Sequence, residues 1–327
     1  MQNRKQSSII SITYIIHHFS RFDKPLFCDS KKTFFTPQNG NYRKDNSMYR
    51  ILEKQSLNAF VTRMKIEAPR VAKKAAPGQF VILRSHADGE RIPLTIADYD
   101  RSEGSVTIIF QVVGSGTERL NHLNVGDCIP DFVGPLGNAT HLDGLCKVAV
   151  VGGGVGCAIA YPIAKALFER GVEVHSIVGF RNKDLAILEK DFKAHSTKFV
   201  PVSDDGSWGE RGLVTDALRA LIASGEKYDK VIAIGPLPMM KFVSLLTKEF
   251  DIPTVVSMNP IMIDGTGMCG GCRLTVGGKV KFACVDGPEF NGHLVDFDEA
   301  IARSSMYRST ERKAHEDTCN LFRKEAD

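Results

Sequence analysis

The pattern of apolar and polar positions divides the chain into parts of different character. From residue 48 to about 145, short runs alternate apolar and polar side chains, as at 60–66 and 105–112. Turn sequences such as Pro77-Gly78 and Ser102-Glu103-Gly104 separate these runs. Alternation over short runs indicates half-buried strands. We therefore predict a small antiparallel β-barrel over residues 48–145, with residues 118–124 as its only amphipathic helix.

After residue 146 the strand patterns lose their polar face. Residues 147–151 form a continuous apolar run, and a glycine-rich turn follows them. Further strand patterns at 173–179, 199–203, 230–235 and 254–258 alternate with helix patterns at 158–170, 185–195, 213–223 and 239–250. Such alternation indicates a parallel sheet with helices on both faces. We predict an α/β nucleotide-binding domain of about five strands over residues 146–258.

The regular pattern stops after Met258. Residues 259–290 are rich in glycine and contain one hairpin pattern, at 273–282, in which Gly277-Gly278 suits a tight turn. The charged stretch 297–326 predicts helix. Residues 259–327 therefore form a third part, consisting of a loop, a hairpin and a helical tail.

The charge is concentrated at the start of the chain. The net charge is +4, but residues 1–47 hold eight Lys or Arg and three Asp, contributing +5, which leaves −1 for the rest. This distribution argues against a nucleic-acid partner. Five scattered cysteines (28, 128, 146, 157 and 319) do not form the dense framework of a secreted disulfide protein. No run reaches the roughly 18 apolar residues of a membrane helix, so we expect a cytoplasmic protein.

Residues 1–47 are basic and contain no acidic residue before Asp23. They suit either an organelle targeting peptide or a mis-assigned start upstream of Met48. We prefer the second interpretation, because residues 34–40 show no amphipathic period and patterned sequence begins at Met48. In both cases we expect this extension to be poorly ordered.

The richest motif is a glycine loop with three cysteines. Asp264, Cys269, Cys272 and Cys284 are spaced D-x4-C-x2-C-x11-C, the plant-type [2Fe–2S] pattern with an aspartate at its first position. Glycines at 265, 267, 270 and 271 allow the backbone to wrap closely around the sulfides. We predict these four residues as the cluster ligands. The alternatives are a zinc site, a redox dithiol, or an Asx-turn at Asp264 with Cys319 as the fourth ligand.

The α/β part carries glycines where strands end. The turn at 152–156 would place backbone N–H groups of a helix N-terminus toward a dinucleotide pyrophosphate, although such turns also serve packing alone. Two further segments follow strands that end at the same edge of the sheet. The predicted nucleotide-binding residues are Gly152, Gly153, Gly154, Gly156, Asp204, Asp205, Gly235, Pro236 and Met239.

In the barrel part, Arg91-Ile92-Pro93-Leu94-Thr95 stands out. The guanidinium fork of Arg91 suits a pyrophosphate, and Thr95 offers a hydroxyl on the same strand. The alternative is an ordinary surface arginine. Gly116-Thr117, near the start of the predicted helix, would supply a second phosphate contact.

The order of these motifs resembles the ferredoxin–NADP reductase superfamily over about residues 48–300. Within it, the chain is similar to the branch of dihydroorotate dehydrogenase electron-transfer subunits and small subunits of NADH-dependent reduced ferredoxin:NADP oxidoreductases. The resemblance implies FAD on the barrel, with Arg91 at the pyrophosphate and Thr95, the catalytic position, near the flavin N5. It also implies NAD(H) on the α/β domain. The other residues expected to contact FAD are Gln79, Pro93, Leu94, Gly114, Gly116 and Thr117.

The resemblance further implies a function. Hydride would pass from the nicotinamide to the flavin, which divides the electron pair for the cluster. The electrons would leave to a larger flavin and iron–sulfur subunit in a bifurcating heterodimer that uses NADP and ferredoxin. In this branch Asp264 is typical of the ferredoxin:NADP oxidoreductases, whereas dihydroorotate-linked subunits carry cysteine.

Several alternatives remain open at this point. The partner could be dihydroorotate dehydrogenase, a sulfite reductase or a hydrogenase. A protein of another class, a zinc-binding interaction module, would share the cysteine loop. NADP(H) is not excluded, because Arg181 and Lys183 follow the second strand, where an acidic residue would favour NAD.

Overall fold

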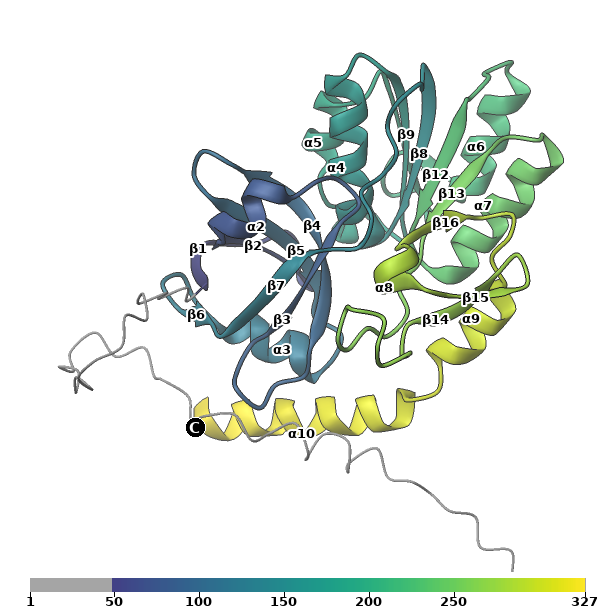
Figure 1. Cartoon of the computed structure of the whole chain (residues 1–327). Helices are drawn as coiled ribbons and strands as arrows, with labels where there is room; N and C mark the ends of the chain where they lie inside the picture. The colour runs from purple at the N-terminus through teal and green to yellow at the C-terminus, as the bar shows by residue number, and fades with distance from the viewer. Residues whose placement is uncertain (1–48, 327) are drawn as a thin grey trace, which may run out of the picture. The chain divides into compact units, whose positions relative to one another are not determined.

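The structure is a computed structural model that describes residues 49–326. The prediction for residues 1–47 lies outside the described residues. Figure 1 shows a barrel, a layered α/β sheet, and a C-terminal part that runs from the α/β sheet back toward the barrel.

The barrel consists of seven strands, all paired antiparallel. In chain order they are β1 (Tyr49–Ser56), β2 (Val61–Glu67), β3 (Phe80–Arg84), β4 (Ile92–Asp100), β5 (Ser105–Gln111), β6 (Cys128–Ile129) and β7 (Asp131–Leu136). The sheet order is β6-β1-β2-β5-β4-β3-β7. Since only Pro130 separates β6 from β7, the two ends of this order meet in the chain and the sheet curls round, as predicted. Met64, Ile66, Ile108 and Phe110 are among the buried side chains of its core.

The helix predicted at 118–124 is present as α3 (Ser115–His122), which begins and ends earlier than expected. The prediction that it is the only helix of this part was wrong, because the barrel also carries α2 (Pro69–Lys74). A helix of six residues that buries only Val71 and Ala72 is too short to show a period in the sequence. Pro69 at its first turn is compatible with helix, because the missing N–H has no partner there in any case.

The α/β sheet confirms the predicted parallel strands and extends them. The parallel strands are β8 (Lys147–Gly153), β9 (Glu173–Phe180), β10 (Lys198–Ser203), β11 (Glu210–Arg211), β12 (Lys230–Ile234) and β13 (Thr254–Ser257). The order is β11-β10-β9-β8-β12-β13-β16, in which β16 (Glu289–Asn291) is an antiparallel edge strand. The C-terminal part thus contributes a strand to this sheet, which the sequence pattern did not indicate.

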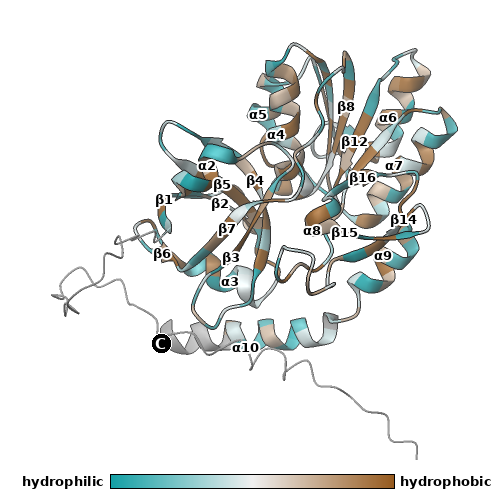
Figure 2. Cartoon of the chain, in the orientation of Figure 1, coloured by the Kyte–Doolittle hydropathy of each residue, from teal (hydrophilic) through white to brown (hydrophobic). Residues whose placement is uncertain are grey.

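Helices cover both faces of this sheet. They are α4 (Gly156–Glu169) and α5 (Glu189–Ala194) on one face, α6 (Val214–Ala223) and α7 (Leu237–Glu249) on the other, with a short 3-10 turn η1 (Lys183–Leu185). Alternate residues of β8 face the two layers: Val148 and Val150 pack with the α4 side, Ala149 and Val151 with the α6 side. This explains why the central strands have no polar face, as their colour in Figure 2 shows.

The C-terminal part follows the predicted pattern. The hairpin of β14 (Arg273–Val276) and β15 (Lys279–Phe282) turns at Gly277 and Gly278, whose φ angles are 57° and 74°. The remaining helices are α8 (Ala283–Asp286), α9 (Phe297–Ser304) and α10 (Arg308–Ala326). Among residues 49–326, no helix has the length and apolarity needed to cross a membrane.

The start of α4 packs against the end of β12 without any intervening side chain. A Cβ atom added at Gly156 would lie 2.6 Å from the Gly235 Cα and 2.6 Å from the Ile234 carbonyl oxygen. Both are backbone atoms, which cannot move aside as a flexible side chain can. The glycine therefore sets how closely this helix approaches the strand.

We expect Gly156→Ala to lower the free energy of unfolding by about 1–3 kcal/mol, because the added methyl group overpacks this contact. An unstrained Gly→Ala change inside a helix would instead raise the free energy of unfolding by about 0.5–1 kcal/mol. The sign of the change therefore distinguishes a close contact from free space. Denaturant unfolding measures the difference. Gly114→Ala, where a Cβ meets nothing within 4 Å, is the control and should change little. An unchanged or increased stability for Gly156→Ala would contradict the packing.

Candidate functional site

The four predicted cluster ligands form two pairs. Cys272 and Cys284 are both buried, and their Sγ atoms lie 3.2 Å apart. Cys269 is exposed, and its Sγ lies 3.5 Å from Oδ1 of the half-buried Asp264. The structure therefore brings the four predicted ligands together as two pairs, Asp264 with Cys269 and Cys272 with Cys284.

The hairpin explains the first pair. Cys272 directly precedes β14 and Cys284 follows β15, and Arg273 is the register partner of Phe282. The backbone N–H of Ala283 donates to the Cys272 carbonyl oxygen over 3.1 Å, which continues the ladder past the strand ends. The register of the hairpin thus places the two thiols side by side.

Hydrogen bonds to one carboxylate explain the second pair. Asp264 accepts from the backbone N–H groups of Thr266 (3.1 Å), Met268 (3.1 Å) and Cys269 (3.0 Å). Gly265 and Gly267 within this turn have φ angles of 79° and 83°, which other residues rarely adopt. The Asx-turn considered as an alternative role of Asp264 is present, and it brings Cys269 back toward the carboxylate.

The electrostatic environment differs between the pairs. Burial acts to raise the pKa of Asp264, but hydrogen bonds from Thr266 and Cys269 outweigh it and hold the pKa below its usual value. Asp264 is therefore ionised, as a metal ligand must be. Burial, followed by the hydrogen bond with Cys272, raises the pKa of Cys284 to about 12. Iron binding must displace the thiol protons, since the thiolate is the ligand.

The donor set fits a two-iron cluster better than a single zinc ion. A [2Fe–2S] cluster has four protein ligands, two on each iron, and the pairs Asp264–Cys269 and Cys272–Cys284 supply this arrangement. One tetrahedral zinc ion would need all its ligand atoms around a single point. Among the described residues, the groups of three or more potential ligands within 4.8 Å of one another do not include these four. Cys319, considered as another ligand, is grouped with Glu118 and His315 instead.

The cluster loop lies directly on the barrel. A Cβ at Gly265 would lie 2.8 Å from Cδ1 of Ile82 on β3 and 2.7 Å from Cδ1 of Leu136 on β7. Ile82 is the register partner of Pro93 on β4, and Phe80 is the partner of Thr95. The Arg-x-Pro-Leu-Thr strand, with Leu94 opposite Val81, is therefore one strand away from the cluster loop.

The predicted flavin residues differ in their contacts within the protein. Arg91 is exposed at the start of β4 and, among residues 49–326, makes no hydrogen bond or ion pair, so its guanidinium is available to an anion. The Thr117 hydroxyl accepts from the backbone N–H groups of Val113 and Gly114, both at 3.1 Å, and so caps α3. The Glu90 carboxylate lies against Gly116, and a phosphate could bind there only after this side chain had rotated away.

Gln79 is engaged within the protein. Its Nε2 donates to the Gly137 carbonyl oxygen over 2.9 Å, and its Oε1 accepts from the Ala76 N–H over 3.1 Å. The side chain therefore joins the turn before β3 to the loop after β7. It supports this turn, and its expected contact with FAD stays a prediction.

The two glycine-bearing strand ends of the α/β sheet lie side by side. Gly152 on β8 is the register partner of Ile234 on β12, and the direction of the strand order changes between these strands. Open α/β sheets bind ligands at such a point. The Met239 side chain packs over both Gly153 and Gly235. Residues 152–156, Gly235, Pro236 and Met239 thus share one edge, and α4 begins there with the positive end of its dipole.

Asp204 and Asp205 follow β10, which is two strands away from β8, or about 10 Å. Their backbone N–H groups donate to the carbonyl oxygens of Phe180 and Arg181, just after β9. Hydrogen bonds from the Ser207 hydroxyl and N–H lower the pKa of Asp205. These carboxylates lie at the same edge as the glycine turn but do not adjoin it.

Sequence reasoning missed a partly buried carboxyl group between the barrel and the α/β sheet. Glu289 on β16 accepts a 2.5 Å hydrogen bond from the Thr140 hydroxyl, and both lie against Gly78 in the turn before β3. Burial raises the pKa of Glu289 in spite of this bond. No motif marks the position, because the contact depends on how β16 joins the second sheet.

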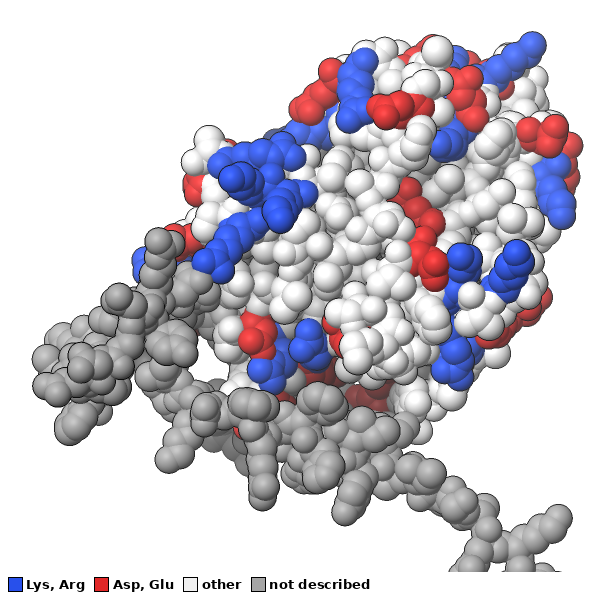
Figure 3. Space-filling model, in the orientation of Figure 1, with Lys and Arg blue, Asp and Glu red and all other residues white. Residues whose placement is uncertain are grey.

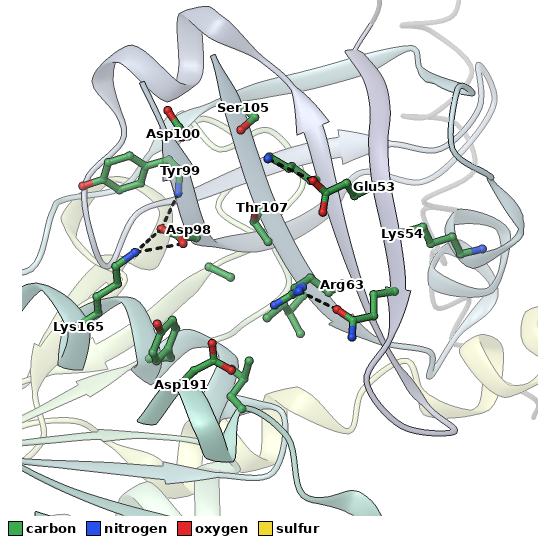
Figure 4. Close-up of a pocket in the computed structure, with 16 residues that line it drawn as sticks. Glu53, Lys54, Arg63, Asp98, Tyr99, Asp100, Ser105, Thr107, Lys165 and Asp191 are labelled. Atoms are coloured by element: carbon green, nitrogen blue, oxygen red, sulfur yellow. Dashed lines mark hydrogen bonds and ion pairs between the residues drawn. The ribbon is translucent and has the colours of Figure 1, made fainter. Parts of the chain in front are cut away.

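A cleft lined by charged side chains lies elsewhere. It has a volume of about 380 Å³ and is lined by the outer face of the barrel and by α4 and α5 (Figure 4). Its charged side chains largely satisfy one another: Lys165 Nζ lies 3.2 Å from both carboxylate oxygens of Asp98, and Arg63 donates to Gln55 over 2.7 Å. None of the predicted site residues lines it.

Comparison with known proteins places the chain in a family. Residues 259–296 match the iron–sulfur cluster binding domain of dihydroorotate dehydrogenase B. The chain is 48% identical over 270 residues to the dihydroorotate dehydrogenase B (NAD(+)) electron transfer subunit homolog of Thermotoga maritima, covering 80% of this chain and 95% of that protein. It is 53% identical over 275 residues to an uncharacterized protein of Clostridium beijerinckii, covering 82% of this chain and 93% of that protein.

Solved structures agree with this relationship. A chain of the NADH-dependent reduced ferredoxin–NADP oxidoreductase, studied for flavin-based electron bifurcation, superposes with a TM-score of 0.79 at 45% identity, covering 84% of this chain and 99% of that one. Amycolatopsis cytochrome P450 reductase, at 23% identity and a TM-score of 0.52, covers 62% of this chain and 65% of that one, and shares the fold alone. This chain belongs to the family of dihydroorotate dehydrogenase B electron-transfer subunits and their homologues, which have a ferredoxin reductase-type fold.

Proposed function

We propose that this chain is the NAD-side electron-transfer subunit of a complex whose larger subunit carries further flavin and iron–sulfur centres and uses NADP and ferredoxin. The observation that carries the proposal is the pairing of the four loop ligands, Asp264 with Cys269 and Cys272 with Cys284, on a loop that touches β3 and β7. This contact supports a cluster site next to the strand expected to hold the flavin.

Family membership confirms the predicted class, an oxidoreductase subunit with FAD, an iron–sulfur cluster and NAD(H). We assign the cluster to the four loop ligands, FAD to the strand Arg91–Thr95, and NAD(H) to the edge formed by residues 152–156 and Gly235–Met239. When bound, the flavin accepts an electron pair as hydride and releases single electrons that a cluster can carry. The divisions 48–145, 146–258 and 259–327 would then each hold one cofactor.

The residues of this chain fix the relative positions of these sites. Phe80 and Ile82 of β3 share one hydrophobic core with Met258, Met262 and the buried ligand Cys272. Such packing leaves no room for water and holds the loop against the barrel. Because the ligand Cys284 also belongs to this core, the cluster would have one buried side toward the barrel and one side, at Cys269, open to a partner.

The open side has the character of a docking surface. Ile261, Ile263, Met268 and Val285 surround the ligands and are exposed by 42%, 51%, 88% and 43%. Contiguous exposed apolar side chains commonly mark protein interaction sites. Figure 3 shows few charged side chains at the centre of this face, over β7 and α8. A larger subunit docking there would receive electrons directly from the cluster.

A second candidate partner is dihydroorotate dehydrogenase, because several relatives are named as its electron-transfer subunit. Asp264 favours the ferredoxin:NADP oxidoreductase, since the dihydroorotate-linked subunits of this branch carry cysteine at the first ligand position. The similarity to a chain of that oxidoreductase supports the same choice. Sulfite reductase and hydrogenase complexes have no specific observation in their favour.

Isolation of the complex tests the proposal as a whole. We expect the full chain, tagged and isolated from its own host, to show flavin absorption in the blue with a broad iron–sulfur shoulder, and to bring a larger flavin and iron–sulfur subunit with it. Absorption spectroscopy, metal analysis and identification of the second subunit provide the readouts. A colourless protein with zinc at the cysteine loop would overturn the redox assignment. A coloured protein bound to dihydroorotate dehydrogenase would overturn only the choice of partner.

Replacing the carboxylate tests whether Asp264 is a ligand. Asp264→Cys should retain the cluster but shift its EPR g values and reduction potential, because a softer thiolate replaces a carboxylate on one iron. Asp298→Asn, which alters an exposed carboxylate paired with Lys241, is the control and should leave the EPR spectrum unchanged. An EPR spectrum of Asp264→Cys identical to that of the unmodified chain would show that Asp264 is not a ligand.

Steady-state kinetics with NADH and NADPH test the nicotinamide preference. We expect kcat/KM for dye reduction to be at least about tenfold higher with NADH than with NADPH, a difference of about 1.4 kcal/mol. Replacing the exposed Arg181 and Lys183 by Ala should leave the NADH value within about threefold and lower the NADPH value further, since only the 2′-phosphate would use these cations. A preference for NADPH that this double variant abolishes would reverse the assignment.

A further inference from the structure

The C-terminal helix α10 lies along α3 of the barrel (Figure 1). The Ser115 and Thr318 hydroxyl oxygens are 2.6 Å apart, and Thr318 is only 4% exposed. Yet of residues 308–319 only Ala314 and Cys319 are apolar. Over residues 308–319, therefore, the helix offers little apolar surface for packing against α3.

Three potential metal ligands meet at this contact. Glu118 on α3 and His315 and Cys319 on α10 offer ligand atoms that all lie within 4.8 Å of one another. His315 Nε2 lies 3.8 Å from Glu118 Oε2 and 3.5 Å from Cys319 Sγ. Zinc bond lengths of about 2.0–2.3 Å in a tetrahedral site place ligand atoms about 3.3–3.8 Å apart. These two separations therefore already match those of a tetrahedral zinc site.

Helix geometry supplies the arrangement. His315 and Cys319 are four residues apart and so share one face of α10, as Glu118 and His122 do on α3. His122 Nε2 lies 3.3 Å from Glu118 Oε1, which brings a second imidazole beside the group. All three members of the group are half-buried, so the site is reachable from solvent and partly shielded from it.

We propose that Glu118, His315 and Cys319 bind a Zn²⁺ ion that joins α10 to α3, with a water molecule as the fourth ligand. A set of one thiolate, one imidazole and one carboxylate suits zinc, which takes S, N and O donors in tetrahedral sites. The ion would neutralise the carboxylate and thiolate and attach the polar stretch 308–319 of α10 to α3. Because α3 starts beside Gly114, the joined helices would stiffen the predicted flavin phosphate contact.

A second cluster in the α/β sheet shows what distinguishes a metal site from an ion-pair network. Glu173, His175 and Glu226 also offer ligand atoms within 4.8 Å of one another. There, however, Lys147 Nζ lies 2.8 Å from Glu173 and also pairs with Glu226. The ammonium group already occupies the position a cation would take. At the contact between α3 and α10, the ion pairs of Glu118 are made with histidines, which are themselves metal ligands.

Zinc binding to the full chain tests the proposal. The protein is purified with its cofactors, treated with a mild chelator and titrated with ZnCl₂ by calorimetry, and the bound metal is counted by elemental analysis. We expect a single zinc ion per chain and, by X-ray absorption, a shell with a single sulfur. A chain that binds no zinc, or a shell with several sulfurs as at the cysteine loop, would overturn the proposal.

Variants locate the site. His315→Gln and Cys319→Ser should each weaken zinc binding about 100-fold or more, because each removes a direct ligand. Cys146→Ser, at an exposed cysteine far from α10 in the sequence, is the matched control and should bind as the unmodified chain does. The double variant Cys269→Ser/Cys272→Ser, which removes the cluster loop as a competing binder, should keep this zinc site.

The readouts also separate folding from ligation. Circular dichroism checks that each variant is folded, and hydrogen exchange should show slower exchange in α10 when zinc is added to the unmodified chain but not to Cys319→Ser. Unchanged affinity in both His315→Gln and Cys319→Ser would overturn the proposal. So would loss of zinc binding only in Cys269→Ser/Cys272→Ser. The proposal does not rest on the proposed function, since zinc binding in that double variant is independent of the redox cluster.

Discussion

The contact between Gly265 and the barrel side chains Ile82 and Leu136 is the constraint on which the rest of the site depends. It joins a loop near the C-terminus to strands from the first part of the chain. Any side chain at position 265 would need the space those two side chains occupy, and the φ angle of 79° already favours glycine. This contact joins the cluster loop to β3, the neighbour of the strand expected to hold the flavin.

The same constraint explains why the C-terminal part contributes to both sheets. On the side of the α/β sheet, β16 pairs with β13. On the side of the barrel, the backbone N–H of Asn138, just after β7, donates to the carbonyl oxygen of Gly287 over 2.7 Å. Glu289 and Thr140 add a partly buried hydrogen bond at the same junction. The segment that holds the cluster is therefore fixed on both sides, so its position follows from packing in both sheets.

Much of this arrangement could be predicted, because its determinants are local. Alternating apolar and polar residues predicted the barrel strands, and continuous apolar runs predicted the parallel strands. Gly277-Gly278 predicted the hairpin that pairs Cys272 with Cys284. What could not be predicted depends on distant contacts. β16 is three residues long and becomes a strand only by pairing with β13. The helix α2 was missed because it is short, and the engagement of Gln79 with Gly137 depends on tertiary structure.

Asp264 illustrates how one residue can serve the fold and the chemistry together. Its carboxylate accepts N–H groups from Thr266, Met268 and Cys269, and so shapes the turn that returns Cys269 to it. A thiolate has a single, softer acceptor atom and would organise these donors less well. The carboxylate that differs from the usual cluster ligand is thus also the group that folds the loop, which couples the loop's shape to the electronic character of the iron beside it. Its low pKa has the same origin, because the N–H groups that shape the turn also stabilise the charge a metal ligand needs.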